Sequence, residues 1–219
     1  NSKIICLKDK DEAKHALKLF SDKLTYDGKD RFDNEKKFIQ YANINNISEI
    51  AKISIMSVKE RWIIMDWLEG SVPKKLNKRD IESIAEFIVG INRTSNEGKE
   101  RLGEAAECVR SPDELIKNIN NRMKNLSAKM GEEVEIKTEL CSKINEEIKR
   151  FRQNTKEEWW ESERTGRYVS PSDVGIHNTL KKSKNLMYVD FEYAGLDDIS
   201  KLVNDWIVNP NYILCRDQE

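Results

Sequence analysis

Residues 170–180 read Ser-Pro-Ser-Asp-Val-Gly-Ile-His-Asn-Thr-Leu, and residues 188–195 continue with Tyr-Val-Asp-Phe-Glu-Tyr-Ala-Gly. The first stretch contains Asp173 and, five positions later, Asn178. An apolar run then leads to Asp190, twelve positions beyond Asn178. Carboxylate and amide oxygens are hard ligands of the kind that Mg²⁺ prefers. The spacing predicts a loop with a carboxylate, followed by a strand that ends at a second carboxylate.

This order of side chains meets the needs of phosphoryl transfer. The reaction needs a carboxylate near the attacking hydroxyl and oxygen ligands for Mg²⁺ on the phosphates. Asp173, Asn178 and Asp190 supply these groups in that order. An Asp and an Asn at this spacing occur by chance in many chains, so the interpretation needs support from the rest of the sequence.

The composition argues against several other classes of protein. The 219 residues include 38 Lys and Arg and 39 Asp and Glu, and these charges are interspersed, so no basic stripe points to nucleic acid. No apolar run approaches the ~20 residues of a membrane span. The sequence shows no signal peptide, although it opens at Asn1 without Met, so we expect a trimmed start.

The cysteines are sparse and widely spaced. They fit no zinc spacing and no disulfide scaffold, so we expect reduced thiols and a cytoplasmic protein. The four cysteines are Cys6, Cys108, Cys141 and Cys215. The sequence leaves the oligomeric state open.

The first seventy residues predict a small, mostly antiparallel sheet with one helix. Apolar runs at 4–7 and 16–20 flank a charged turn, which is typical of a hairpin. Residues 53–57 and 61–68 read as two more strands, and residues 31–42 have helical spacing. Lys18 lies at the centre of an apolar run, with Glu35 as its candidate partner. Alternation alone would equally place Lys18 on a solvated face.

Helical patterns dominate the rest of the chain. Apolar residues from Ile81 to Val89 recur at helical spacing. Ser111-Pro112-Asp113-Glu114 is a good helix start, and residues 134–151 predict another long helix. Trp159 and Trp160 are expected to be packing anchors, with a substrate-stacking wall as the alternative. The turn at residues 70–73 divides the chain into expected lobes of residues 1–70 and 71–219.

Taken together, the chain resembles the aminoglycoside phosphotransferase and choline kinase-like family of small-molecule kinases. The resemblance covers nearly the whole chain and is sharpest at residues 170–198, then at 16–20 with 31–35, and at 62–70. It implies an α+β, two-lobed, protein-kinase-like fold: a small antiparallel sheet with one helix, then a larger, mostly helical lobe. It also implies ATP, Mg²⁺ and a small-molecule hydroxyl acceptor such as an aminoglycoside, an amino alcohol or a sugar.

The resemblance assigns roles by position. Asp173 resembles the catalytic base, and Asn178 and Asp190 resemble the Mg²⁺ ligands. Lys18 resembles the strand lysine that contacts the α- and β-phosphates, held in place by Glu35. Two further groups would border the nucleotide or brace the catalytic loop. They are Ser2 beside the phosphates with Met65, Asp66 and Trp67 beside the adenine, and Asp198 and Asp205 as the bracing residues.

The chain also departs from the family pattern. Where the family often has His-Gly-Asp, this chain has Pro171-Ser172-Asp173. The lost His is usually structural, so its absence weakens the bracing of the loop more than the chemistry. His177 is not a substitute base by its spacing, and we interpret it as a packing or hydrogen-bonding residue. The Gly-rich part of the phosphate loop is absent, and the chain stops soon after Pro210.

These departures leave three readings open. The favoured one is an active small-molecule kinase, and the alternative is a catalytically inactive kinase-like fold that acts as a binding module. A protein kinase is disfavoured because no Ala-Pro-Glu signature follows Asp190. The acidic residues from Glu157 to Glu163 could attract a cationic acceptor, but solvated surface is the favoured interpretation.

Overall fold

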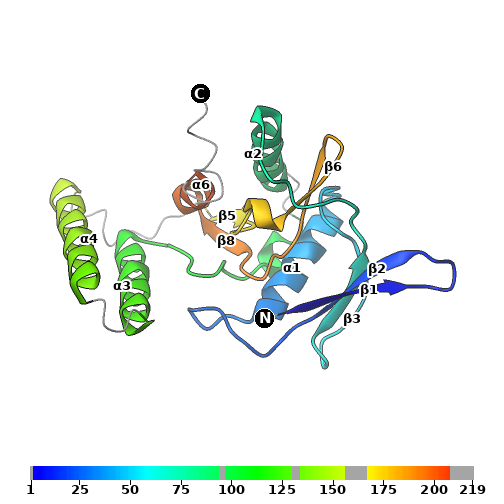
Figure 1. Cartoon of the computed structure of the whole chain (residues 1–219), viewed down its shortest axis with the longest axis horizontal. Coiled ribbons are helices and arrows are strands. Elements are labelled where there is room, and N and C mark those ends of the chain that lie inside the picture. The colour runs from blue at the N-terminus through cyan, green and yellow to red at the C-terminus, as the bar shows by residue number, and fades with distance from the viewer. Residues whose placement is uncertain (1, 94–96, 130–133, 156–166, 208–219) are drawn as a thin grey trace. The chain divides into compact units, whose positions relative to one another are not determined.

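The computed structural model describes residues 2–93, 97–129, 134–155 and 167–207. Its contacts form two units, one from residues Asn1–Cys108 and Arg167–Glu219 and the other from Val109–Gly166 (Figure 1). The mixture of a small antiparallel sheet with several helices confirms the α+β class expected from the sequence. The expected lobe boundary at residue 70 falls inside the first unit and stays a prediction.

The first unit opens with a four-stranded antiparallel sheet. Its strands are β1 (Lys3–Lys8), β2 (Lys14–Leu19), β3 (Ile53–Ser57) and β4 (Trp62–Asp66), in the spatial order β1-β2-β4-β3. The β1–β2 hairpin and the other two strands confirm the prediction from the apolar runs. Lys18 lies in the inner strand β2, opposite Ile4 on one side and Ile63 on the other.

Helix α1 (Arg31–Ile44) lies against this sheet (Figure 1). Asp30 caps the helix, because its side chain accepts from the N–H groups of Phe32 and Asp33. The Asp30 carboxylate also pairs with Arg61 at 2.7 Å. Phe32 packs edge-on against Phe20 of the β2 end, with ring centroids 5.2 Å apart. The cap and the aromatic contact fix α1, and therefore Glu35, relative to the lysine strand.

The remaining elements of the first unit follow in two chain segments. Helix α2 (Lys78–Arg93) comes before η1 (Lys99–Arg101). After residue 167 come the strand pairs β5–β8 and β6–β7, with η2 between β5 and β6, and then helix α6. Their bounds are β5 (Arg167–Ser170), η2 (Ile176–Asn178), β6 (Thr179–Lys182), β7 (Asn185–Tyr188), β8 (Gly195–Asp198) and α6 (Ile199–Ile207).

A reciprocal cap starts α2 and ties it to β6. Asp80 donates its N–H to Asn77 Oδ1 at 3.0 Å, and Asn77 donates its N–H to Asp80 Oδ2 at 3.0 Å. The same buried carboxylate accepts from Lys181 Nζ at 2.6 and 2.7 Å. Ser71 bridges to Lys181 through the main chain, so the segment after β4 is fastened to β6.

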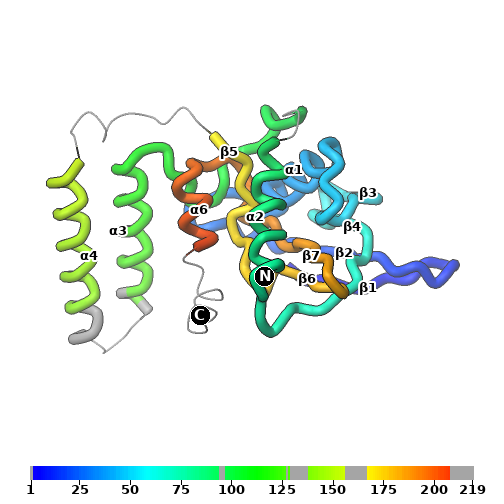
Figure 2. Tube along the Cα trace, turned by 90° about the horizontal axis from the view of Figure 1, so that it is seen from above, coloured from blue at the N-terminus to red at the C-terminus, as the bar shows by residue number. Residues whose placement is uncertain are grey.

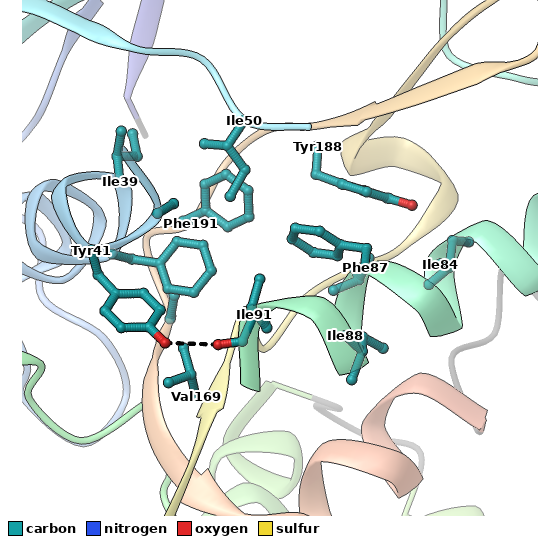
Figure 3. Packing of buried hydrophobic residues seen from close by; sticks show 14 of the residues in the cluster. Ile39, Tyr41, Ile50, Ile84, Phe87, Ile88, Ile91, Val169, Tyr188 and Phe191 are labelled. Carbon is teal, nitrogen blue, oxygen red and sulfur yellow. Dashed lines mark hydrogen bonds between the residues drawn. The ribbon is translucent and has the colours of Figure 1, made fainter. Parts of the chain in front are cut away.

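One hydrophobic core joins α1, α2 and the strand that leads to Asp190 (Figure 3). Tyr188 stacks on Phe87 of α2, with ring centroids 4.1 Å apart. Phe191 packs on Phe38 of α1 at 4.6 Å. The two aromatic contacts hold the chain on both sides of Asp190, so the core sets the position of its backbone.

The second unit is a pair of helices, α3 (Pro112–Lys129) and α4 (Val134–Asn154), which run side by side (Figure 2). The helix start predicted at Ser111 is confirmed, because Ser111 Oγ accepts from the N–H of Glu114 at 3.3 Å. Arg152 of α4 pairs with Asp113 of α3 at 3.1 Å. Trp159, Trp160 and the acidic stretch that ends at Glu163 lie outside the described residues.

None of the helices in the described part of the chain is both long enough and apolar enough to cross a membrane.

Candidate active site

The centre of the candidate site is the buried amine of Lys18, whose side chain is 2% exposed. Its Nζ lies 2.5 Å from Glu35 Oε2, 2.7 Å from Asp190 Oδ1 and 3.3 Å from Glu192 Oε1. Burial would lower the pKa of Lys18, but the charges of Glu35 and Asp190 raise it above its ordinary value. A charge in an apolar strand is tolerated here because it is paired on three sides. The alternative prediction, that Lys18 lies on a solvated face of the strand, is therefore wrong.

Glu35 comes from α1 and is almost as deeply buried as its partner, with 2% exposure. Burial raises the pKa of this carboxyl to about 7, opposed by the charge of Lys18 and assisted by the charge of Asp190. Oxygens of Glu35, Asp190 and Glu192 all lie within 4.8 Å of one another. Lys18 and Arg31 both pair with this group of carboxyls, so at most one net negative charge is left to attract a cation.

Asp190 is held in a backbone conformation that most residues avoid. Its φ is 66°, in the left-handed region, where Asp is one of the better-tolerated residues after glycine. Its side chain is 44% exposed, so the carboxylate that contacts Lys18 can also reach a ligand. The N–H of Val189 donates to the main-chain oxygen of Asn178 at 3.0 Å, which brings the two predicted metal ligands onto neighbouring strands of chain.

The side chain of Asn178 offers one oxygen atom that can coordinate a metal ion. Its side-chain Nδ2 donates to the main-chain oxygen of Asp173 at 3.0 Å. The amide nitrogen is therefore committed to the loop, and Oδ1 is the atom that can coordinate a cation. The Val189 bond brings the main chains of Asn178 and Asp190 together, and amide and carboxylate oxygens are ligands that Mg²⁺ prefers. The residues fit the metal that the sequence predicts.

Asp173 lies in the loop before η2, with its side chain 37% exposed. The N–H of Asp173 donates to Pro171 O at 2.9 Å. Its carboxylate Oδ2 lies 3.1 Å from Nε2 of His177. The spacing of four residues was the one signal of this contact in the sequence. The structure therefore makes His177 a hydrogen-bonding residue, as interpreted, and its partner is the predicted base.

Ser172 supplies hydrogen bonds to the loop that lacks the family's usual His. It has a φ of 60°, a left-handed conformation at the position where the family often has glycine. Its Oγ donates to Tyr193 O at 2.9 Å, and its N–H donates to Ser170 Oγ at 3.1 Å. The hydroxyl ties the loop of Asp173 to the segment that follows Asp190.

Three residues of the site were not predicted from the sequence: Arg31, Glu192 and Tyr193. Arg31, at the start of α1, donates to Glu192 Oε2 at 3.1 Å and to Tyr193 OH at 2.7 Å. Burial would raise the pKa of Glu192, but a hydrogen bond from Ser2 and the charges of Lys18 and Arg31 hold it below its ordinary value. Ser2, expected beside the phosphates, thus contacts the carboxylate that faces Lys18.

A cavity of about 260 Å³ opens beside the Lys18 cluster. Its walls are mainly apolar, and its charged groups gather around Lys18, Glu35 and Asp190. A mostly apolar pocket with a few polar groups is the usual form of a small-molecule site. The predicted nucleotide-binding residues Met65, Asp66 and Trp67 also line it, whereas Ser2 does not. Further wall residues include Ala16, Ile39, Leu68, Leu180 and Tyr188.

No protein-family model matches the sequence, and no curated protein matches it. Solved structures do match. Macrolide 2'-phosphotransferase type I superposes with a TM-score of 0.60 at 10% identity, over 96% of this chain and 68% of that one. Aminoglycoside phosphotransferase APH(4)-Ia gives 0.58 at 12% identity, over 100% of this chain and 79% of that one. The chain has the fold of the kinase-like small-molecule phosphotransferases.

Two more structures with this kinase-like fold are informative. An ethanolamine kinase from Plasmodium vivax gives a TM-score of 0.53 at 15% identity, and this chain covers 57% of its length. A thermostable variant of APH(4)-Ia, with a TM-score of 0.59 at 12% identity, is a ternary complex with ADP and hygromycin B, covering 99% of this chain and 73% of that one. At such low identity, the similarity shows the fold and carries no residue roles.

Within the kinase-like fold, Asp198 directly precedes helix α6 and Asp205 lies within it. Asp198 Oδ1 accepts from the N–H of Ser200 at 2.8 Å, which caps the helix. Asp205 pairs with Lys201 at 2.5 Å, and Lys201 also pairs with Asp197 at 3.0 Å. The bracing of the catalytic loop by Asp198 and Asp205 stays a prediction.

Proposed function

We propose that the chain is an ATP- and Mg²⁺-dependent phosphotransferase that moves the γ-phosphate to a hydroxyl of a small molecule. The observation that carries the proposal is the buried contact of Lys18 with Glu35 and Asp190 at the wall of the cavity. An ammonium group, a paired helix carboxylate and an acidic residue at a strand end are the parts that phosphate binding needs.

The nucleotide would bind with its base in the apolar part of the cavity and its phosphates toward Lys18. Met65 and Trp67 would border the base, together with Asp66, from the segment after β4. Glu35 would hold Lys18 at the phosphates, and Ser2 would lie beside them. Asn178 and Asp190 would hold Mg²⁺. When bound, the metal neutralises charge on the phosphates.

Asp173 would act on the acceptor. Its carboxylate would receive the proton of the acceptor hydroxyl as the acceptor oxygen forms its bond to the γ-phosphorus. The bond between that phosphorus and the bridging oxygen breaks, and ADP leaves with that oxygen. Catalysis of this kind depends mainly on positioning and on charge stabilisation. The half-exposed Asp173 and the shielded Lys18 suit those two tasks.

The acceptor belongs to the class of small alcohols. Proteins of the same fold are a macrolide phosphotransferase, an aminoglycoside phosphotransferase and an ethanolamine kinase, and one fold serves many acceptors. An aminoglycoside, an amino alcohol or a sugar-like molecule is therefore the proposed acceptor. We place the protein in the cytoplasm, where ATP is available, and propose no nucleic-acid or membrane partner.

The test is a titration of ATP into the protein with and without Mg²⁺, for the wild type, Asp190→Asn and the control Asp33→Asn. Asp33 is an α1 surface residue paired with Lys36 and Lys37. We expect Mg²⁺-dependent binding that Asp190→Asn weakens by at least about tenfold, a typical effect of losing a charged metal ligand, and that the control retains.

A screen of aminoglycosides, macrolides, ethanolamine, choline and amino sugars would then follow. Absence of Mg²⁺–ATP binding in the wild type would reject the proposal. It would favour the catalytically inactive binding module, for which the altered residues Pro171 and Ser172 are the specific observation.

A further inference from the structure

The candidate base has a side-chain partner that its proposed role does not require. Nε2 of His177 lies 3.1 Å from Oδ2 of Asp173. The main chain of Asp173 is already fixed, since its N–H donates to Pro171 O and its carbonyl accepts from Asn178. What the backbone bonds leave undetermined is the rotation of the carboxylate, and His177 contacts that carboxylate.

The contact lies on the open side of the loop. The side chain of His177 is 51% exposed and that of Asp173 is 37% exposed. Neither residue belongs to the hydrophobic core around Phe87 and Tyr188. A histidine in this place contributes little to the packing of the fold, so its contact with Asp173 is best explained by what it does to the carboxylate.

The chemistry of the two groups decides which of them donates the hydrogen bond. An ionised carboxylate can accept hydrogen bonds but cannot donate them. Nε2 of His177 must therefore carry the proton and donate it to Oδ2. The same nitrogen has no lone pair with which to remove a proton from Asp173, so the pair is not a relay in which His177 is the final base. Its effect on Asp173 is geometric.

We propose that His177 is a positioning residue of the phosphoryl transfer: it holds Oδ2 of Asp173, so that Oδ1 receives the proton of the acceptor hydroxyl. The inference rests on the proposed function. A carboxylate free to rotate spends less time within hydrogen-bond reach of that proton, and small misplacements of a catalytic group cost rate. In the proposed function the phosphates bind at Lys18 and Asp190, whereas the described contact of His177 is with the acceptor-side residue Asp173.

The test compares His177→Ala, His177→Asn and His177→Gln with the wild type. The amide nitrogen of Gln reaches about as far as Nε2, whereas that of Asn corresponds to Nδ1, so Gln alone can restore the donor. The reaction measured is hydrolysis of Mg²⁺–ATP, with water as the acceptor, together with titration of Mg²⁺–ATP. The melting temperature of each variant shows whether it is folded.

We expect kcat to fall about ten- to hundredfold in the Ala and Asn variants, up to the cost of misplacing a catalytic group by about 1 Å. The KM and Kd for Mg²⁺–ATP should stay unchanged, and the Gln variant should recover to within about threefold of the wild type, as its donor still reaches Oδ2. The chain contains two histidines, and the other, His15, also contacts a carboxylate, with Nε2 3.4 Å from Asp9 Oδ2 in the β1–β2 hairpin. His15→Gln is the matched control and should retain wild-type kinetics.

Wild-type kcat in His177→Ala would overturn the inference while leaving the proposed function intact. A Gln variant as slow as the Ala variant would overturn it too, because the donor would then not be what matters. A raised KM for Mg²⁺–ATP with an unchanged kcat in His177→Ala would also overturn the inference, because it would place His177 at the nucleotide. A wild type that fails to bind Mg²⁺–ATP would instead remove the proposed function and this inference with it. If the wild type binds Mg²⁺–ATP without hydrolysing it, the same variants are compared with the acceptor found in the screen, with the same expected and contrary outcomes.

Discussion

The Lys18 cluster makes the candidate site sensitive to protonation. Glu35 is buried beside Lys18, with Asp190 and Glu192 close to the same amine. Burial raises the pKa of Glu35 from an ordinary value of 4.5 to about 7. The folded protein therefore holds this proton more tightly than the unfolded chain does.

A change in stability with pH follows from Glu35. Its contribution is present in full below the unfolded pKa of about 4.5 and is lost as the pH rises through about 7. We expect the free energy of unfolding to decrease between pH 5 and pH 8, by at most about 1.4 kcal/mol per pH unit. Urea unfolding of the wild type and of Glu35→Gln at several pH values tests this, because the substitution should flatten the slope. An equal slope in both proteins would contradict it.

Some residues of the site could be predicted from the sequence and others could not. Lys18 stood out because a charge inside an apolar run is unusual, and Asp173, Asn178 and Asp190 stood out by their spacing. Arg31 gave no comparable signal, because its contact with Glu192 joins residues 161 positions apart and depends on the tertiary fold. Local patterns carry information about neighbours on one element, and not about distant partners.

At the scale of elements, segments with a clear apolar pattern were predicted well, and the four-residue strands β5 and β8 were not. The β1–β2 hairpin, α1 and α2 repeat their apolar pattern over enough residues to be recognised. Strands β5 and β8 have four residues each, and they pair across 24 intervening residues. Four residues are too few for alternation to distinguish a strand from a loop, so the pairing of β5 with β8 was not expected.

Gly195, the first residue of β8, lies where neighbouring backbone leaves no room for a side chain. A Cβ on Gly195 would lie 2.4 Å from the N of Ala105 and 2.6 Å from main-chain atoms of residues 103 and 104. The same segment pairs with Leu196, whose N–H donates to Gly103 O at 2.8 Å. Because these neighbours are backbone atoms in a bridge, they cannot move aside as a flexible side chain can.

We expect Gly195→Ala to lower the free energy of unfolding by about 3 kcal/mol, the upper range of overpacking effects. Gly90→Ala is the matched control, because it lies within α2 and its Cβ would meet nothing within 4 Å. The control should raise stability by about 0.5–1 kcal/mol through helix propensity. Thermal or urea unfolding of both variants decides the point, and equal stabilities would refute the assigned backbone clash.

At the scale of the whole molecule, the second unit is an insertion in the first. The chain leaves the first unit at Cys108 and returns to it at Arg167. Arg167 pairs with Glu104 at 2.8 Å, and Glu104 bridges to Leu196, so the two connection points lie close together. Domains with neighbouring ends tolerate insertion and removal. All residues that line the cavity belong to the first unit.

Replacement of residues 109–166 by a short Gly-Ser linker should therefore leave nucleotide binding in place. We expect a Kd for Mg²⁺–ATP within about threefold of the wild type, because an insertion with neighbouring ends is thermodynamically dispensable to its host. Calorimetric titration of the shortened protein measures it. A loss of binding in a shortened protein that still melts cooperatively would show that the nucleotide site needs the insertion.

The ion pair between Lys18 and Asp190 joins residues 172 positions apart, and this has a consequence during synthesis. At ribosomal rates of about 5–20 residues per second, Lys18 is made roughly 10–30 s before Asp190. Glu35 follows Lys18 by 17 positions, so a first carboxylate is available early. The remaining partners, and the far wall of the cavity, do not yet exist. For that interval the nascent sheet exposes the apolar surface that lines the cavity, and the pocket is complete only after residue 191 has been made.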